Sequence, residues 1–150
     1  MAAVGGAQTV SIDMSKNYLE WGKENFKLNQ IEPAKHTFIE EDVLQFIEQA
    51  SAWPDFAGTF DTIFLDPPTF SNSKSMKSDF DVERDQVHLV QKVAKFLKPE
   101  GVLYFSNNKR DFKLSPELQS QFRLKDISAA TIPIDFHDQK IHRCFEIRNK

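Results

Sequence analysis

The run Asp66-Pro67-Pro68 is the stretch of the sequence whose residue types and spacing most directly suggest chemistry. It directly follows residues 62–65, whose apolar and β-branched side chains predict a buried strand. Proline cannot donate a hydrogen bond to a sheet ladder, so the two prolines end the strand and leave Asp66 on a stiff turn. Because ligands of open α/β sheets bind outside the carboxyl ends of the strands, this corner is a candidate reaction site.

Two further aspartates, Asp13 and Asp42, follow predicted strands and could bind a nucleotide. A carboxylate in such a place can accept hydrogen bonds from both ribose hydroxyls, and one at the next strand end can accept from an exocyclic amino group. Crossover connections are right-handed, so both acids and Asp66 are expected at the same edge of the sheet. Structural alternatives stay open, because Asp13 can form a turn before Ser15 and Asp42 can cap a helix beginning at Val43.

Hydrophobic periodicity predicts strands alternating with helices along the chain. Strands are expected at residues 8–12, 36–40, 60–66, 102–105, 122–132 and 141–148, and helices at 16–29, from 43, at 79–97 and from 115. This order is typical of an α/β fold with a doubly wound, mostly parallel sheet, and the alternating last segment predicts an antiparallel terminal strand. Residues 69–77 are polar and without periodicity, which predicts a loop directly after the Asp-Pro-Pro corner.

Composition predicts one soluble globular domain in a chain of 150 residues, with no apolar run near the ~18 residues of a membrane helix. The start of the chain lacks signal-peptide features, and the single cysteine, Cys144, fits a reducing compartment, so we expect a cytoplasmic protein. The net charge of −3 lacks the basic excess of proteins that neutralise many phosphates. Either the partner is not nucleic acid, or local basic patches or another domain supply the affinity.

Five stretches together resemble a known family. They are residues 10–15, 18–21, 25–29, 61–74 and 105–110. They are similar to class I methyltransferases that use S-adenosylmethionine, which have a Rossmann-like fold. More closely they resemble bacterial 23S ribosomal RNA methyltransferases with an Asp-Pro-Pro-x-Phe motif, and in particular the C-terminal, guanine-N7 methylating domains of bifunctional members. The resemblance implies S-adenosylmethionine as the cofactor and 23S ribosomal RNA as the partner.

The resemblance also implies a cofactor site. Asp13 would bind the ribose hydroxyls, with Met14 beside it, and Asp42 would face the adenine, with the backbone N–H of Val43 as a second contact. Asp66 would lie where the methyl donor meets the acceptor base.

On the acceptor side, the resemblance implies a catalytic group formed by Asp66, Pro67, Pro68, Phe70 and Asn107. Phe70 could stack on a flipped base, since RNA-binding proteins commonly stack unpaired bases on aromatic rings.

Three basic residues, Lys74, Lys109 and Arg110, would contact RNA phosphate or base edges beside this acceptor group.

One departure from the family lies at the amino-terminal end. The family's first strand and Gly-rich turn should come just before Gly5, and none of the five glycines forms a Gly-x-Gly pattern. We therefore expect residues 1–150 to be a partial methyltransferase domain without its first strand, with an RNA-binding or second methyltransferase domain lying outside the sequence. Unpaired sheet edges would favour a homodimer.

The acceptor chemistry favours a purine. Guanine N7 has a free lone pair and needs no general base, whereas pyrimidine C5 methylation needs a cysteine thiolate. Related C5 enzymes carry that cysteine after the fourth strand, where this sequence has residues 106–108, Ser-Asn-Asn. Cys144 is expected to be a core residue. The four histidines have no metal-ligand spacing, so no metal is expected.

Three alternatives to guanine-N7 methylation remain open from the sequence. The chain could be a truncated, inactive fragment of such an enzyme, or a methyltransferase of another RNA base. It could also be a nucleotide-binding Rossmann oxidoreductase with Asp13 on the ribose of NAD, although the glycine fingerprint is missing.

Overall fold

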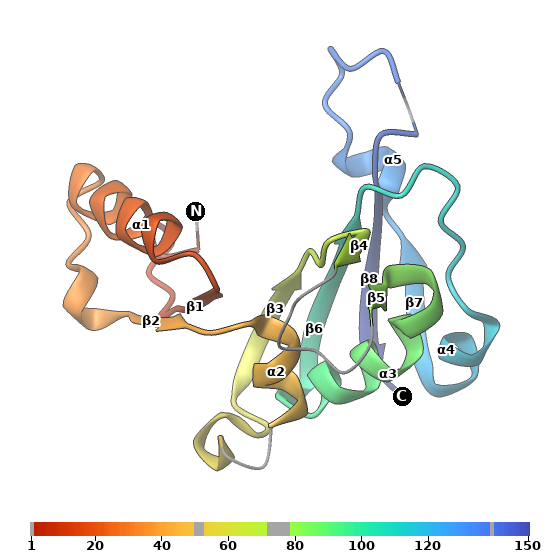
Figure 1. The fold of residues 1–150 in the computed structure, drawn as a ribbon, viewed down its shortest axis with the longest axis horizontal. Helices are drawn as coiled ribbons and strands as arrows, with labels where there is room; N and C mark the ends of the chain where they lie inside the picture. Colours follow the sequence, from red (N-terminus) through yellow and green to blue (C-terminus); the bar gives the residue numbers. More distant parts are fainter. Residues whose placement is uncertain (1, 50–52, 72–78, 139) are drawn as a thin grey trace. The chain divides into compact units, whose positions relative to one another are not determined.

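The computed structural model describes residues 2–49, 53–71, 79–138 and 140–150 (Figure 1). The chain divides into two compact units, Met1–Gln49 and Ala50–Lys150. No helix within these described ranges is long and apolar enough to cross a membrane.

The first unit contains a two-stranded parallel sheet joined by a helix. Its elements are β1 (Val10–Asp13), α1 (Lys16–Leu28), a 3-10 turn (Pro33–Lys35), β2 (Thr37–Glu40) and α2 (Val43–Glu48). The Ser15 side chain accepts a hydrogen bond from the backbone N–H of Tyr18, and this N-cap fixes where α1 begins. Phe26 of α1 packs edge-on against Phe38 of β2, with ring centroids 5.4 Å apart. The helix is thereby held on one face of the parallel pair.

The second unit is built on a four-stranded sheet in the order β3-β6-β8-β7. The strands are β3 (Phe60–Leu65), β6 (Leu97–Asn107), β7 (Phe122–Asp126) and β8 (Arg143–Asn149). β3 pairs in parallel with β6, and β8 is antiparallel to both β6 and β7. Therefore β3, β6 and β7 run in one direction and β8 runs in the other (Figure 1). The predicted α/β fold with an antiparallel terminal strand is confirmed.

The helices of the second unit and a short hairpin complete its core. They are a 3-10 turn (Pro54–Phe56), the paired strands β4 (Phe70–Ser71) and β5 (Phe80–Asp81), α3 (Val82–Ala94), α4 (Pro116–Gln121) and α5 (Ser128–Thr131). The most deeply buried side chains include Leu103 and Phe105 of β6, Ile147 of β8, Val90 of α3 and Leu118 of α4. Each such large apolar side chain contributes roughly 1.5–3 kcal/mol by leaving water. The core thus holds β6 and β8 in the middle of the sheet.

Two predicted boundaries around residue 97 were wrong. The helix expected at 79–97 is α3, Val82–Ala94, because the Asp81 carboxylate caps it and Leu97 already pairs with Phe60 in the sheet. The strand expected at 102–105 is the longer β6. An irregularity in its pairing, between the partners of Phe60 and Thr62, accommodates residues 98–101. Gly101 is required there, since a Cβ atom would lie 2.9 Å from the carbonyl oxygen of Phe60.

The predicted strand 122–132 was also too long. It ends at Asp126, whose carboxylate Oδ1 accepts from both the backbone N–H and the hydroxyl of Ser128, and α5 follows. The last strand begins at Arg143 rather than at residue 141, and it lies inside the sheet. Local side-chain capping ended the fifth strand where β-branched composition alone predicted that it would continue.

The corner after β3 differs in two ways from its prediction. The segment expected to be buried lies on an edge strand, so that Leu65 is buried but Phe64 remains 68 % exposed. The polar loop expected at 69–77 begins with β4, which pairs with β5. The rest of that predicted loop, residues 72–78, lies outside the described residues.

Candidate functional site

The first unit brings two of the predicted acids to one edge of its sheet. Asp13 ends β1 opposite Glu40, and Asp42 follows β2 by two residues. The Asp13 Oδ1 atom accepts from the backbone N–H of Ser15 at 2.7 Å, and the Asp42 Oδ1 atom accepts from that of Leu44 at 2.9 Å. Asp13 therefore does form a turn before Ser15, and Asp42 does cap α2, as the structural alternatives predicted. The Oδ2 atom of each carboxylate has no partner within the described part of the chain, so one acceptor oxygen of each acid remains for a ligand.

Met14 and Val43 follow these acids directly. The Met14 side chain is 69 % exposed, and Val43 is the first residue of α2. Both lie in the same unit as Asp13 and Asp42.

The second unit brings Asp66 and Asn107 to the carboxyl edge of its own sheet. Leu65 pairs with Phe105 in the parallel β3–β6 ladder, so Asp66 follows β3 where β6 reaches its end at Asn107. Asp66 is exposed and has no hydrogen bond or ion pair to another described residue. Pro67 is buried, which anchors the stiff turn. The edge therefore presents an unneutralised carboxylate on a rigid support.

Two neighbours of Asp66 in the predicted acceptor group, Pro68 and Phe70, are exposed. The Phe70 ring, on β4, is 53 % exposed and could receive a flat ligand group.

Asn107 is fully buried and only half satisfied. Its Oδ1 atom accepts from the backbone N–H of Lys109 at 3.1 Å, whereas its Nδ2 atom has no hydrogen-bond partner among the described residues. Buried polar atoms are nearly always paired, so an unpaired amide at a strand end is a functional signal.

Two of the basic residues expected to contact RNA, Lys109 and Arg110, form ion pairs with carboxylates of the protein. The Lys109 Nζ atom lies 2.6 Å from Glu83 Oε2 and 3.7 Å from Asp81 Oδ1, and the hydrogen bond to Glu83 is the main cause that raises the pKa of Lys109. Arg110 is paired with Asp138 at 2.7 Å. Lys74 lies outside the described residues. Lys109 and Arg110 would have to exchange these partners before they could bind phosphate.

Cys144 is a core residue, as predicted. It lies on β8 opposite Ser106 and is 3 % exposed, and burial raises the pKa of its thiol. A buried thiol with a raised pKa is a poor nucleophile at neutral pH. This placement argues against C5 chemistry through Cys144.

Sequence reasoning missed Arg143, the residue on β8 directly opposite Asn107. A signal was present, since the alternation of residues 141–148 puts Arg143 on the same face as Phe145 and Ile147. A charged residue in an apolar series, at the start of the strand, marks an edge position.

The described residues contain no group of three or more His, Cys, Asp or Glu side chains that could hold a metal ion.

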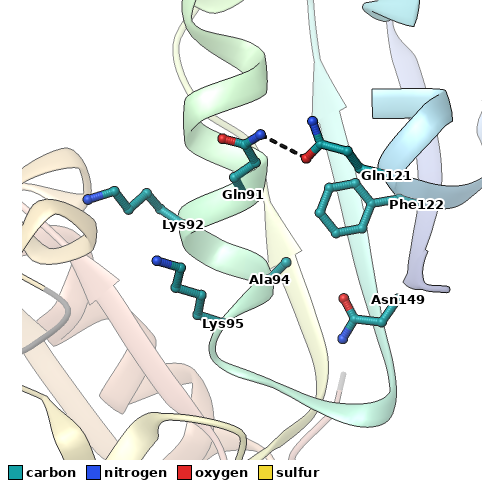
Figure 2. Close-up of a pocket in the computed structure, with 7 residues that line it drawn as sticks. All are labelled: Gln91, Lys92, Ala94, Lys95, Gln121, Phe122 and Asn149. Carbon is teal, nitrogen blue, oxygen red and sulfur yellow. Dashed lines mark hydrogen bonds between the residues drawn. The ribbon is translucent and has the colours of Figure 1, made fainter. Parts of the chain in front are cut away.

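A hollow of about 520 Å³ is lined by seven residues of the second unit (Figure 2), none of them in the predicted acceptor group. Its lining residues are Gln91, Lys92, Ala94, Lys95, Gln121, Phe122 and Asn149. They come from the end of α3, the end of α4, the start of β7 and the end of β8, and Gln91 donates to Gln121 across the hollow at 2.7 Å. Because β6 and β7 begin at this edge, the hollow is at the opposite end of the sheet from Asn107.

Comparisons with known proteins agree on one family. Residues 1–149 match the family model described as "Methyltransferase domain". The chain is 44 % identical over 150 residues to the ribosomal RNA large subunit methyltransferase K of Neisseria meningitidis. The aligned region covers 99 % of this chain and 42 % of that protein. It is 45 % identical over 147 residues to the ribosomal RNA large subunit methyltransferase K/L of Legionella pneumophila, and the aligned region covers 97 % of this chain and 20 % of that protein. The chain thus spans less than half the length of these relatives.

Solved structures show the same fold at lower identity. A SAM-dependent methyltransferase from Agrobacterium tumefaciens is 20 % identical with a TM-score of 0.70, over 99 % of this chain and 51 % of that one. A Streptococcus mutans protein assigned as a SAM-dependent methyltransferase is 22 % identical with a TM-score of 0.72, over 97 % and 40 %. With a family match over almost its entire length, the chain belongs to the methyltransferase domain family.

Proposed function

We propose that the chain is the catalytic part of an S-adenosylmethionine-dependent ribosomal RNA methyltransferase that modifies guanine N7 of 23S rRNA. The observation that carries the proposal is the free Asp66 carboxylate beside the half-satisfied Asn107, in a chain 44 % identical to a ribosomal RNA large subunit methyltransferase. A nucleotide-binding oxidoreductase is disfavoured, because the family match is to methyltransferases.

The acids of the first unit suit the adenosine part of the cofactor. The unpaired oxygens of Asp13 and Asp42 can accept from ribose hydroxyls and from the adenine amino group. Met14 and the backbone N–H of Val43 would complete the contact. S-adenosylmethionine supplies a methyl group on a sulfonium, which makes the carbon electrophilic.

The acceptor side needs little acid–base chemistry. Guanine N7 would accept the methyl group with its own lone pair and would lose no proton, so the guanine would become cationic. Asp66 would stabilise this charge on its stiff turn with Pro67 and Pro68, while Phe70 stacks on the base and Asn107 orients it. Alignment of donor and acceptor supplies most of the rate.

RNA affinity would be shared with other parts of a longer protein. The net charge is −3, and Lys109 and Arg110 are paired with carboxylates. We infer that Lys74, Lys109 and Arg110 provide local contacts, and that an additional domain provides the remaining phosphate neutralisation in the cytoplasm. β1 and β3 each have a strand neighbour on one side only among the described strands, which supports pairing with a second copy or with a further strand.

Calorimetric titration with S-adenosylhomocysteine tests the cofactor assignment. Binding that Asp13→Ala abolishes is expected, and a preference for NAD would refute it. If this chain binds no S-adenosylhomocysteine but a longer form does, the chain is an inactive fragment.

A methylation assay on 23S rRNA tests the acceptor assignment. In a form of the protein that is active, Asp66→Ala should lower turnover much more than cofactor affinity. Product mapping by mass spectrometry would overturn the N7 assignment if the methyl group were found on another atom.

A further inference from the structure

Asn107 and Arg143 place two hydrogen-bond donors next to each other on neighbouring strands. The two residues are direct partners in the antiparallel β6–β8 ladder, at the edge where Asp66 follows β3. Directly opposite residues in an antiparallel pair project to the same face of the sheet, with Cβ atoms about 4.5–5.5 Å apart. The side chains of Asn107 and Arg143 therefore share one face at the edge proposed for the acceptor.

The orientation of the Asn107 amide is determined by its one hydrogen bond. The backbone N–H of Lys109 needs an acceptor, so the Asn107 oxygen faces Lys109 and the NH₂ group faces elsewhere. That NH₂ group is buried and has no partner among the described residues. It is a donor that lacks an acceptor.

The Arg143 guanidinium is in a similar state. Its Nε atom is buried and has no hydrogen-bond partner in the described part of the protein. Its nearest carboxylate contact, Nη1 to Asp126 Oδ2, is 3.8 Å and too long for a hydrogen bond. The side chain is 36 % exposed, so other donors of its fork are open to a ligand.

Arg143 differs in this respect from the basic residues that the sequence places at the same edge. Lys109 and Arg110 make close ion pairs of 2.6 and 2.7 Å with Glu83 and Asp138. Arg143 makes no carboxylate contact this short among the described residues. It is thus the better prepared of these cations to receive an incoming acceptor.

We propose that Asn107 and Arg143 form a two-donor site for an oxygen atom of the RNA substrate. Two buried donors without an acceptor are unfavourable until an oxygen with free lone pairs reaches them. RNA offers two such oxygens near a target purine, the O6 atom of guanine and a flanking phosphate oxygen, and arginine binds both well. The proposal rests on the proposed function and adds Arg143 as a residue that positions the acceptor nucleotide.

The test measures RNA binding by the full chain. The probe is a fluorescein-labelled RNA hairpin with a single guanine in its loop, followed by fluorescence anisotropy. Arg143→Met should weaken binding about 5- to 150-fold, the range for a specific arginine contact. Arg143→Lys keeps the charge but removes the fork, so it should also bind more weakly than the unmodified protein.

Two control variants separate a ligand contact from a structural one. Asp126→Asn removes the carboxylate charge but keeps an acceptor oxygen for Ser128, and it should leave RNA affinity unchanged. Lys95→Met removes an exposed cation at the opposite edge of the sheet and should also have no effect. If Asp126→Asn reproduces the loss seen in Arg143→Met, Arg143 acts through its ion pair and the proposal is overturned. Unchanged melting temperatures show that the variants are folded.

Two modified hairpins identify the oxygen. Replacing the loop guanine by 2-aminopurine removes O6, and a methylphosphonate linkage beside it removes the phosphate charge. The modification that removes the correct oxygen should weaken binding by the unmodified protein and cause no further loss in Arg143→Met. Equal binding by Arg143→Met and the unmodified protein would overturn the two-donor site alone. No RNA binding by a chain that binds S-adenosylhomocysteine would overturn the site together with the RNA assignment.

Discussion

Replacing Asn107 with Asp would supply, within the protein, the acceptor that Asn107 and Arg143 lack. One carboxylate oxygen would keep the hydrogen bond from the Lys109 N–H, and the other would accept from Arg143. A charged hydrogen bond contributes about 1.5–3 kcal/mol. The substitution also eliminates the unpaired Asn107 donor and satisfies the unpaired Arg143 donor, each of which costs about 1–3 kcal/mol. Burying the carboxylate costs several kcal/mol, so we expect Asn107→Asp to change the free energy of unfolding by only about 1 kcal/mol.

The same substitution in an Arg143→Met background should have a very different effect. The new carboxylate would then be a buried charge without a partner, which typically costs about 3–5 kcal/mol. The double-mutant cycle should therefore give a coupling free energy of about 2 kcal/mol or more between the two positions. RNA affinity should fall in Asn107→Asp even though its stability is preserved, because the carboxylate replaces the amide donor, accepts from Arg143 and repels an incoming oxygen.

Urea denaturation at pH 7, followed by circular dichroism, measures the four members of this cycle. The slope of unfolding free energy against urea must stay constant for the comparison to hold. If the two substitutions are additive within about 0.5 kcal/mol, then Asn107 and Arg143 do not interact and the reasoning fails.

Three further predictions concern stability and reactivity. Asp81→Ala should cost about 0.5–2 kcal/mol of unfolding free energy at pH 7, because the α3 cap is lost. Backbone hydrogen bonding, chiefly from Arg84, lowers the pKa of Asp81, so this contribution is complete above about pH 4 and is lost as the pH falls through the lowered pKa. Denaturation midpoints of the variant and the unmodified protein that differ equally at pH 3 and pH 7 would contradict this prediction. Gly101→Ala should cost about 1–3 kcal/mol, because its Cβ atom would lie 2.9 Å from the Phe60 carbonyl oxygen, and an unchanged melting temperature would refute this close approach. Iodoacetamide should label Cys144 in urea but not in the native protein, since burial raises the pKa of its thiol; rapid native labelling detected by mass spectrometry would show that the thiol is accessible.

Features encoded by neighbouring residues were predictable from the sequence. The start of α1 follows from the Ser15 cap, and the end of β3 follows from two prolines that cannot extend it. The strand character of residues 143–149 follows from the period-two arrangement that puts Arg143, Phe145 and Ile147 on one face of the strand and Cys144 and Glu146 on the other. In each case the deciding interaction lies within a few residues along the chain, so a pattern could reveal it.

Features decided by distant residues were not predictable in the same way. Leu97 continues the apolar periodicity of α3, yet its pairing with Phe60 makes it the first residue of β6. The exposure of Phe64 depends on which strands lie beside β3.

The candidate site shows the same division. Asp66 was recognisable because its proline neighbours are adjacent in sequence. Lys109 looked available for RNA until the structure placed Glu83 beside it, and Arg143 acquires meaning only from the strand opposite it.

The position of β8 between β6 and β7 has a consequence for synthesis of the protein. β8 follows both neighbours in the chain, and its pairings join residues as far apart as Leu103 and Ile147. While a ribosome is still translating, β6 and β7 emerge before the strand that separates them, and each has an open backbone edge. Closing such long-range pairs is slow compared with helix formation. The second unit therefore completes its sheet only after translation has passed residue 149. Until then the β3–β6 pair and β7 are not joined, and their open edges are available to chaperones.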